Sequence, residues 1–209
     1  MLTHRIVGVP VVVAVLCLGL AGVLNAAEDA GKATLENLQK AYGVESAAKA
    51  RYEAFAAKAD EEGYKGVASL FRALAKSDGL RAEKYAGLIK AGGGEAKAAA
   101  DKPEVKSTKE NLEAAVKSLT TDKEALYPAF AKQAVEEKNT AAAISFKGAT
   151  HIGAASAKLV QEALKDLDGW KAGGKEFLVC QVCNLVTTDL KLQKCPVCSA
   201  PRSKFDVVK

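Results

Sequence analysis

The sequence predicts a mainly α-helical protein, in which a long helical bundle precedes a small cysteine-rich metal domain. Apolar residues recur at steps of three and four over four long segments between residues 33 and 167, as on one face of a helix. Aromatic residues make up only 6% of the chain and alanine is abundant, which favours closely packed helices over a sandwich of sheets. Four cysteines then gather in two Cys-x-x-Cys pairs near the end of the chain.

The composition suits one or two globular domains. Of the 209 residues, 49% are hydrophobic and 26% are charged. The net charge of +5 is mild and is spread over helical faces of mixed sign. No basic run is interleaved with aromatic residues, so we expect no nucleic-acid partner.

Residues 1–26 have the layout of a secretory signal. Arg5 precedes an uncharged, almost wholly apolar run of 19 residues, Ile6 to Leu24, after which the sequence turns polar. We expect cleavage after Ala26 or, as the alternative, an uncleaved membrane anchor, since 19 apolar residues just span a bilayer. Either outcome predicts an extracytoplasmic, periplasmic protein exported by the Sec route, because a single Arg does not fit twin-arginine export.

A four-helix bundle is predicted for residues 27–168. Its helices are expected over 33–61, 64–91, 107–138 and 140–167. Short links join the first helix to the second and the third to the fourth, whereas a long connection that begins at "AGGGE" joins the second to the third. Two helical hairpins joined by a long crossover have the connectivity of a ferritin-like four-helix bundle.

Charged residues interrupt the apolar stripe of the second helix. Asp78 and Arg81 continue the steps of four and three that run through its apolar residues. The inward stripes of the other helices carry, at a similar level, Glu45, Asp122, Gly153 and Ser156. Charged side chains are rarely fully buried unless they are paired. We therefore predict that Arg81 bridges Glu45 and Asp78, with Asp122 as a further partner.

The small residues Gly153 and Ser156 would leave the space that the long Arg81 side chain needs. Three carboxylates against one guanidinium leave a net charge of −2, which a proton, a water molecule or one hard cation would relieve. A reduced one-metal site is an alternative, and so is a rotated second helix that exposes these residues to solvent.

The final module is predicted over residues 176–209, after a linker at 169–175. Its two Cys-x-x-Cys pairs are Cys180 with Cys183 and Cys195 with Cys198, and eleven residues separate them. Such knuckles close a tetrahedral thiolate site. A pair of disulfides is the alternative in an extracytoplasmic protein. The spacing does not choose between iron and zinc, because both accept four thiolates in a tetrahedron.

This layout resembles the rubrerythrin family, in which a ferritin-like bundle precedes a rubredoxin-like domain. The segments that carry the resemblance are "VESAAKARYEAF", "ALYPAFAKQAVEEKN" and "CPVCSAPRSKF". The resemblance implies a carboxylate-bridged di-iron site in the bundle and a rubredoxin-type iron in the final module, which together reduce peroxide.

The bundle departs from the ligand set that the resemblance implies, which is a glutamate on helices one and three and Glu-x-x-His on helices two and four. The corresponding positions here hold Glu45, Asp78, Arg81, Leu119, Asp122, Gly153 and Ser156. Both histidine ligands are therefore absent, and His151 is predicted to point away from the centre. We expect a degenerate di-iron site in which Arg81 takes the place of metal.

The sequence therefore favours an exported rubrerythrin-like redox protein that passes single electrons to a redox partner protein through one iron ion bound by the four cysteines. The bundle would act as a scaffold or as the interface of a homodimer, and a membrane partner is expected only if residues 1–26 stay uncleaved. One alternative is a zinc-binding interaction protein, in which zinc is structural. The other is a residual peroxide reductase that uses Glu45, Asp78 and Asp122.

Overall fold

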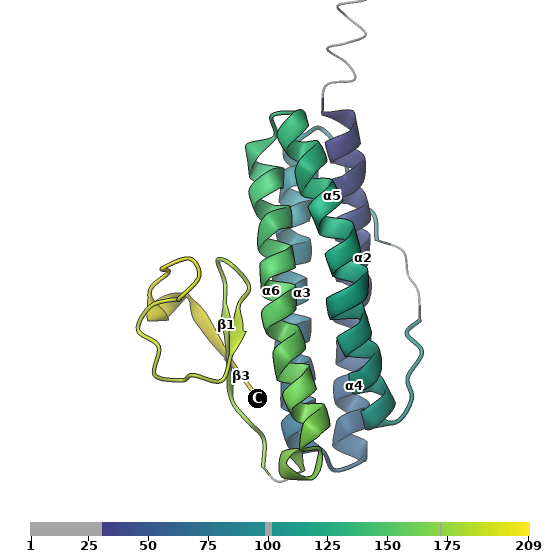
Figure 1. Ribbon diagram of the computed structural model, residues 1–209, viewed down its shortest axis with the longest axis vertical. Coiled ribbons are helices and arrows are strands. Elements are labelled where there is room, and N and C mark those ends of the chain that lie inside the picture. Colours follow the sequence, from purple (N-terminus) through teal and green to yellow (C-terminus); the bar gives the residue numbers. More distant parts are fainter. Residues whose placement is uncertain (1–30, 99–101, 172) are drawn as a thin grey trace, which may run out of the picture.

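The computed structural model describes residues 31–98, 102–171 and 173–209, without the side chains of residues 121–124. The predicted signal or anchor, residues 1–26, lies outside this range. Among the described helices, none has the length and apolar character needed to cross a membrane. The molecule is an elongated bundle of long helices with a small three-stranded module at its side (Figure 1), which confirms the predicted fold class.

The first hairpin consists of α2 (Lys32–Glu61) and α3 (Lys65–Ala91). α2 buries one stripe of residues at helical spacing. The first half of α3 is buried on most of its faces, with six consecutive buried residues at 66–71, and its second half buries a narrower stripe. The glycines after α3 end that helix, because Gly93 has a φ of 80°, which a residue without a Cβ adopts freely.

The second hairpin begins with a helical run that the sequence predicted as one helix. It comprises α4 (Thr108–Lys117), a π-helical segment (Ser118–Asp122) and α5 (Lys123–Glu136). Ser107 and Glu110 start α4 with a reciprocal capping box. Single π-helical turns are frequent at functional sites. The hairpin ends with α6 (Thr140–Lys165), whose first turn is capped by the Asn139 side chain.

A polar level divides the core of the bundle into two apolar clusters. One cluster is built around Tyr52, Phe55 and Phe71, and the other around Tyr127 and Phe146. Along each of three helices, buried residues lie between the part that belongs to one cluster and the part that belongs to the other. They are Glu45 on α2, Asp78 and Arg81 on α3, and Gly153 and Ser156 on α6. The expected common level of these residues is therefore present in the fold.

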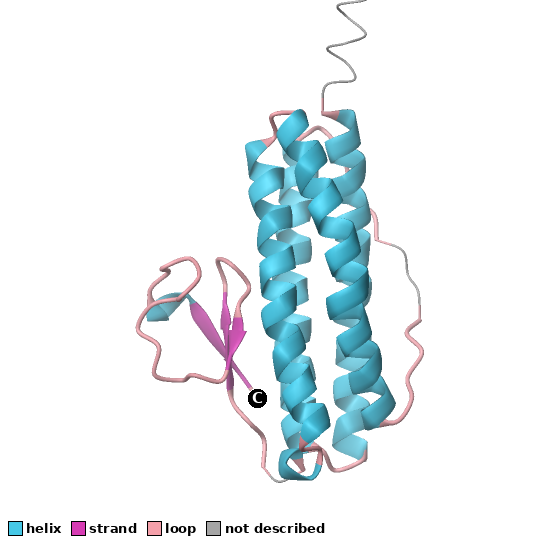
Figure 2. Cartoon of the chain, viewed as in Figure 1, coloured by secondary structure: helices cyan, strands magenta, loops and turns pink. Residues whose placement is uncertain are grey.

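The C-terminal module is a small antiparallel sheet that packs against α3 and α6 (Figures 1 and 2). Its strands are β1 (Phe177–Cys180), β2 (Val186–Thr187) and β3 (Phe205–Val208), in the order β2-β1-β3. Short 3-10 turns lie at Asp168–Trp170 and Arg202–Lys204. Trp170, in the predicted linker, is buried and its ring stacks on Phe177 at 6.3 Å.

Candidate metal centre and buried ionic cluster

The four module cysteines form a compact group of sulfur atoms. Their Sγ atoms all lie within 4.8 Å of one another, and none of the four is in a disulfide. The Sγ distance is 3.7 Å between Cys180 and Cys198 and 3.4 Å between Cys183 and Cys195. A tetrahedral site with metal–sulfur bonds of about 2.3 Å has sulfurs about 3.8 Å apart. The group therefore fits a single tetrahedral metal ion.

Backbone N–H groups of the two knuckles point at these sulfurs. Burial raises the pKa of the Cys180 thiol, and hydrogen bonds from the backbone N–H groups of Cys183 and Val182 oppose that shift. Burial acts on Cys195 in the same direction, but hydrogen bonds from backbone N–H groups and neighbouring thiols bring its net pKa below the ordinary value. These donors would stabilise thiolate, which is the form that binds metal.

One side of the sulfur group lies beside the protein surface. Cys183 and Cys198 are only half-buried, and the neighbouring Val182 and Val197 are 47% and 43% exposed. A cavity of about 270 Å³ separates this side of the module from the bundle, and both half-buried cysteines and Arg81 line it. The least buried edge of the metal site therefore opens onto the cavity between the module and the bundle.

The bundle centre holds a buried ionic cluster of Glu45, Asp78 and Arg81. These residues are 0%, 3% and 4% exposed. Arg81 Nη1 lies 3.1 Å from Glu45 Oε1 and 3.5 Å from Asp78 Oδ1, as the predicted bridge requires. Burial alone lowers the pKa of the Arg81 guanidinium, but the two carboxylates raise it above its ordinary value, so Arg81 remains charged. With both acids ionised, these three groups carry a net charge of −1.

Tyrosines surround the ionic cluster. The Tyr127 hydroxyl donates a hydrogen bond to Glu45 Oε1, the same oxygen that Arg81 approaches. The Tyr52 hydroxyl is fully buried and has no hydrogen-bond partner in the described structure. Burial, with the charges of Asp78 and Glu45, raises the pKa of Tyr52, so it stays a neutral phenol.

The remaining predicted bundle residues have different outcomes. Gly153 and Ser156 are buried on α6, but neither is among the polar contacts of Arg81 in the part of the chain that is described. The Asp122 side chain lies outside the described side chains. His151 is exposed, as its predicted outward direction requires. Leu119, at a ligand position that the resemblance implied, is buried.

Sequence reasoning missed two polar residues that contact the cluster or the module. The spacing of Tyr127 predicts core packing, but its hydroxyl also donates to Glu45. Ser77 is buried on α3 and bonds the module through Asn184. The signal for Ser77 was its position four residues before Arg81, which places both side chains on one face of α3.

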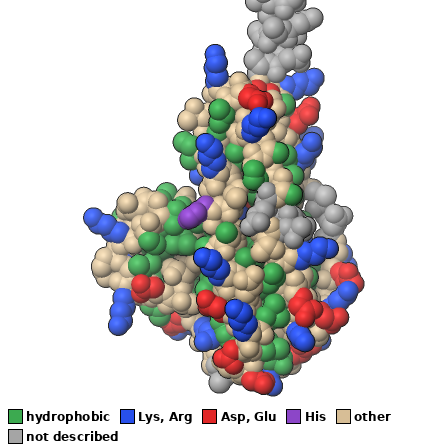
Figure 3. Space-filling model, viewed as in Figure 1, with side chains coloured by type: hydrophobic (Ala, Val, Ile, Leu, Met, Phe, Trp, Pro, Cys, Tyr) green, Lys and Arg blue, Asp and Glu red, His purple; other side chains and the backbone are tan. Residues whose placement is uncertain are grey.

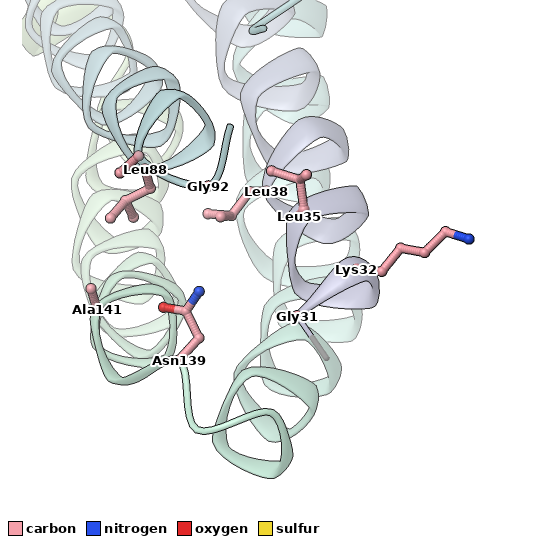
Figure 4. Close-up of a pocket in the computed structure, with 9 residues that line it drawn as sticks. Gly31, Lys32, Leu35, Leu38, Leu88, Gly92, Asn139 and Ala141 are labelled. Carbon is pink, nitrogen blue, oxygen red and sulfur yellow. The ribbon is translucent and has the colours of Figure 1, made fainter. Parts of the chain in front are cut away.

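A separate cavity of about 480 Å³ lies at one end of the bundle (Figure 4). Leu35, Leu38 and Leu88 line it, together with the Asn139 cap of α6, and Lys32 points away from it in the view shown. Its lining offers no cluster of acids, histidines or cysteines within the described chain. On the face shown in Figure 3, basic and acidic side chains are interspersed over the bundle.

Comparison with known proteins places both halves of the molecule in one family. A model of the rubrerythrin family matches residues 36–151. The chain is 31% identical to nigerythrin of Nitratidesulfovibrio vulgaris over 173 residues, which cover 82% of this chain and 85% of the relative. It is also 31% identical to a rubrerythrin of Porphyromonas gingivalis, with 86% of this chain and 92% of the relative covered.

Solved structures agree with this relationship. A structure of fully reduced, all-ferrous nigerythrin superposes with a TM-score of 0.76 at 31% identity, covering 83% of this chain and 86% of that one. A bacterioferritin of Desulfovibrio desulfuricans, at 21% identity and a TM-score of 0.63, covers 69% of this chain and 85% of that one. The second likeness supports the ferritin-like fold of the bundle alone.

Proposed function

This chain belongs to the rubrerythrin family, and on that premise we propose that it is an electron carrier that uses one iron ion bound by four cysteines. The observation that carries the proposal is the group of four free sulfurs, all within 4.8 Å of one another. The family relationship favours iron over zinc, since the related nigerythrin structure is described as all ferrous. Bound there, iron supplies a one-electron couple.

The residues of the module have separate parts in this role. The four cysteines bind the ion and leave no open coordination position, so the site exchanges electrons rather than binding substrate. The backbone N–H groups directed at the sulfurs offset part of their negative charge. Half-buried Cys183 and Cys198 line the cavity between module and bundle, beside exposed Val182 and Val197, and a redox partner protein would come nearest to the metal there.

The ionic cluster supports the further proposal that the bundle has lost di-iron chemistry. A metal cation would have to displace or lie beside Arg81, whose guanidinium already pairs with Glu45 and Asp78. The raised pKa of Arg81 means that it does not lose its charge to admit a cation. The bundle then serves as the scaffold for the module or as the interface of a homodimer.

Export is part of the proposal and rests on the composition of residues 1–26. An apolar run follows Arg5 and ends in the sequence "LNAAED", which suits Sec export to the periplasm. Cell fractionation with N-terminal sequencing tests this. A mature chain in the periplasm that begins near Ala27 supports it, and a cytoplasmic chain that retains Met1 contradicts it.

The test of the metal assignment is a visible spectrum with metal analysis of the purified protein. We expect one iron per chain and a red colour, because ferric thiolate sites absorb visible light. Both should be lost in Cys180→Ser. A colourless protein with one zinc would replace the electron carrier with the structural zinc protein. Two or three irons per chain, retained in part by Cys180→Ser, would restore a metal site in the bundle.

A further inference from the structure

A buried hydrogen bond joins α3 to the first cysteine knuckle. Ser77 Oγ lies 2.8 Å from the backbone carbonyl oxygen of Asn184, and Ser77 is 1% exposed. A carbonyl oxygen only accepts hydrogen bonds, so the Ser77 hydroxyl must be the donor. Asn184 directly follows the ligand Cys183 and has a φ of 67°, the turn conformation of the knuckle. The bond therefore attaches the bundle to the backbone of the metal site.

The peptide unit that accepts this bond also donates one to the metal site. The carbonyl of Asn184 and the N–H of Leu185 belong to the same peptide group, and this N–H hydrogen-bonds the Cys183 sulfur. A donor at the carbonyl end of a peptide polarises it and strengthens its N–H as a donor. Ser77 thus acts on Cys183 through one peptide group.

The other side of Ser77 faces the ionic cluster. Arg81 Nη2 lies 3.4 Å from Ser77 Oγ and donates to it, while Arg81 Nη1 pairs with Glu45. The Ser77 oxygen accepts a hydrogen bond from the Arg81 cation, and the Ser77 hydroxyl donates one to the module. The first bond polarises the hydroxyl and so strengthens the second. A continuous chain of polar contacts therefore runs from Glu45 through Arg81, Ser77 and the Asn184–Leu185 peptide to Cys183.

We propose that Ser77 and Arg81 are positioning residues that hold the first knuckle against α3 and raise the reduction potential of the cysteine-bound metal. The inference rests on the proposed electron-carrier function for its redox part. Reduction adds one electron and breaks no bond, so the site gains negative charge. Hydrogen bonds to ligand sulfurs stabilise that extra charge and thereby raise the potential. The ionic cluster lies where the resemblance to rubrerythrins implied metal ligands. In this proposal it instead tunes the reduction potential of the metal bound by the four cysteines.

The experiment measures the reduction potential of the full iron-loaded chain at an electrode, in Ser77→Ala and in the control Ser69→Ala. Ser69 is also on α3 and equally buried at 1% exposure, but its hydroxyl bonds the Lys65 carbonyl of its own helix. We expect Ser77→Ala to lower the equilibrium constant for reduction about tenfold, a shift of about 59 mV for one electron. Ser69→Ala should leave the potential unchanged.

Hydrogen exchange of the zinc-loaded chain provides a readout that does not depend on iron. Ser77→Ala should speed exchange of the Asn184 and Leu185 amides relative to Ser69→Ala, because the knuckle is no longer held to α3. Equal exchange and equal potentials in the two variants would overturn the proposal. If the protein takes up zinc only, the electron carrier fails, and the exchange comparison still decides whether Ser77 positions the knuckle.

Discussion

The cysteine site and the ionic cluster are both polar groups enclosed by apolar residues, but they balance charge in different ways. The module gathers four potential thiolates of one sign, with only backbone N–H groups to offset them. The bundle gathers two carboxylates around a guanidinium that neutralises one of them. The four cysteines can all be thiolates only with a metal ion as counter-charge, whereas the carboxylates of the bundle already face a guanidinium that offsets one of their two charges. The module therefore takes its cation from solution as a bound metal ion, whereas the bundle supplies a cation of its own in Arg81.

The largest expected effect breaks the metal site. Cys180→Ser should abolish metal binding and unfold the module, because metal affinity in small metal domains is also their folding energy, about 10–16 kcal/mol for structural zinc in peptides. Metal content and exchange of the β1 amides measure this. Val182→Ser is the control, since Val182 lies on the same knuckle and is 47% exposed. Full metal content in Cys180→Ser would remove that cysteine from the site.

Removing the internal cation should have the next largest effect. Arg81→Met leaves Glu45 and Asp78 buried without their guanidinium, which costs about 3–5 kcal/mol of unfolding free energy. Denaturant unfolding measures the loss. Arg51→Met is the control, because Arg51 is only half-buried and its guanidinium bonds the Ser118 hydroxyl. A similar loss in both variants would show that Arg81 contributes packing rather than charge balance.

The triple variant Glu45→Gln, Asp78→Asn, Arg81→Met sharpens the same comparison. It removes all three charges, so no uncompensated charge stays buried, whereas Arg81→Met leaves two carboxylates without their cation. We expect it to recover most of the stability that Arg81→Met loses. A triple variant as unstable as Arg81→Met would contradict charge balance as the cause.

A smaller loss is expected at the edge of the ionic cluster. Tyr127→Phe removes the hydroxyl that donates to Glu45, and hydrogen bonds to charged groups are worth about 1.5–3 kcal/mol. Tyr52→Phe is the matched control, because the Tyr52 hydroxyl is buried without a hydrogen-bond partner among the described residues. Thermal unfolding of the two variants should differ accordingly, and equal melting temperatures would remove Tyr127 from the cluster.

The sequence predicted much of both regions because each leaves a strong local pattern. Cys-x-x-Cys pairs specify two chain reversals, and helical spacing placed Asp78 and Arg81 on the stripe that is buried in the structure. The bridge from Arg81 to Glu45 and Asp78 followed from the rule that buried charges are paired.

The contacts between the two regions could not be predicted in the same way. The bond from Ser77 to Asn184 spans 107 residues and depends on how the module docks, which no local pattern encodes. The π-helical segment Ser118–Asp122 also went unpredicted, because regular helical spacing assumes 3.6 residues per turn, whereas the extra residue moves the buried stripe by one position, to Tyr127 and Phe130. Tyr127 has the spacing of a core residue, and its hydroxyl partner became visible only with the position of α2.

The smallest expected effect concerns an ion pair at the surface between the two regions. Lys76 Nζ of α3 lies 3.1 Å from Asp206 Oδ2 of β3. Burial raises the pKa of Asp206, but the Gln181 amide and the Lys76 ammonium together lower it by more, so the net pKa is below its ordinary value. A lowered folded-state pKa gives stabilisation that is complete above the ordinary pKa and is lost as pH falls through the folded value.

Docking of the module should therefore weaken below about pH 4, the ordinary range of an aspartate. The Lys76 side chain is 45% exposed, so solvent screens the pair and limits it to about 0.2–1 kcal/mol. Lys76→Ala should lose this amount at neutral pH and show a weaker acid dependence than the parent chain. Hydrogen exchange of the β3 amides measures it, with Lys90→Ala as the control, because Lys90 is exposed in the last turn of the same helix. If Lys90→Ala has the same effect as Lys76→Ala, general surface charge explains the loss, and the pair of Lys76 with Asp206 does not hold the module to α3.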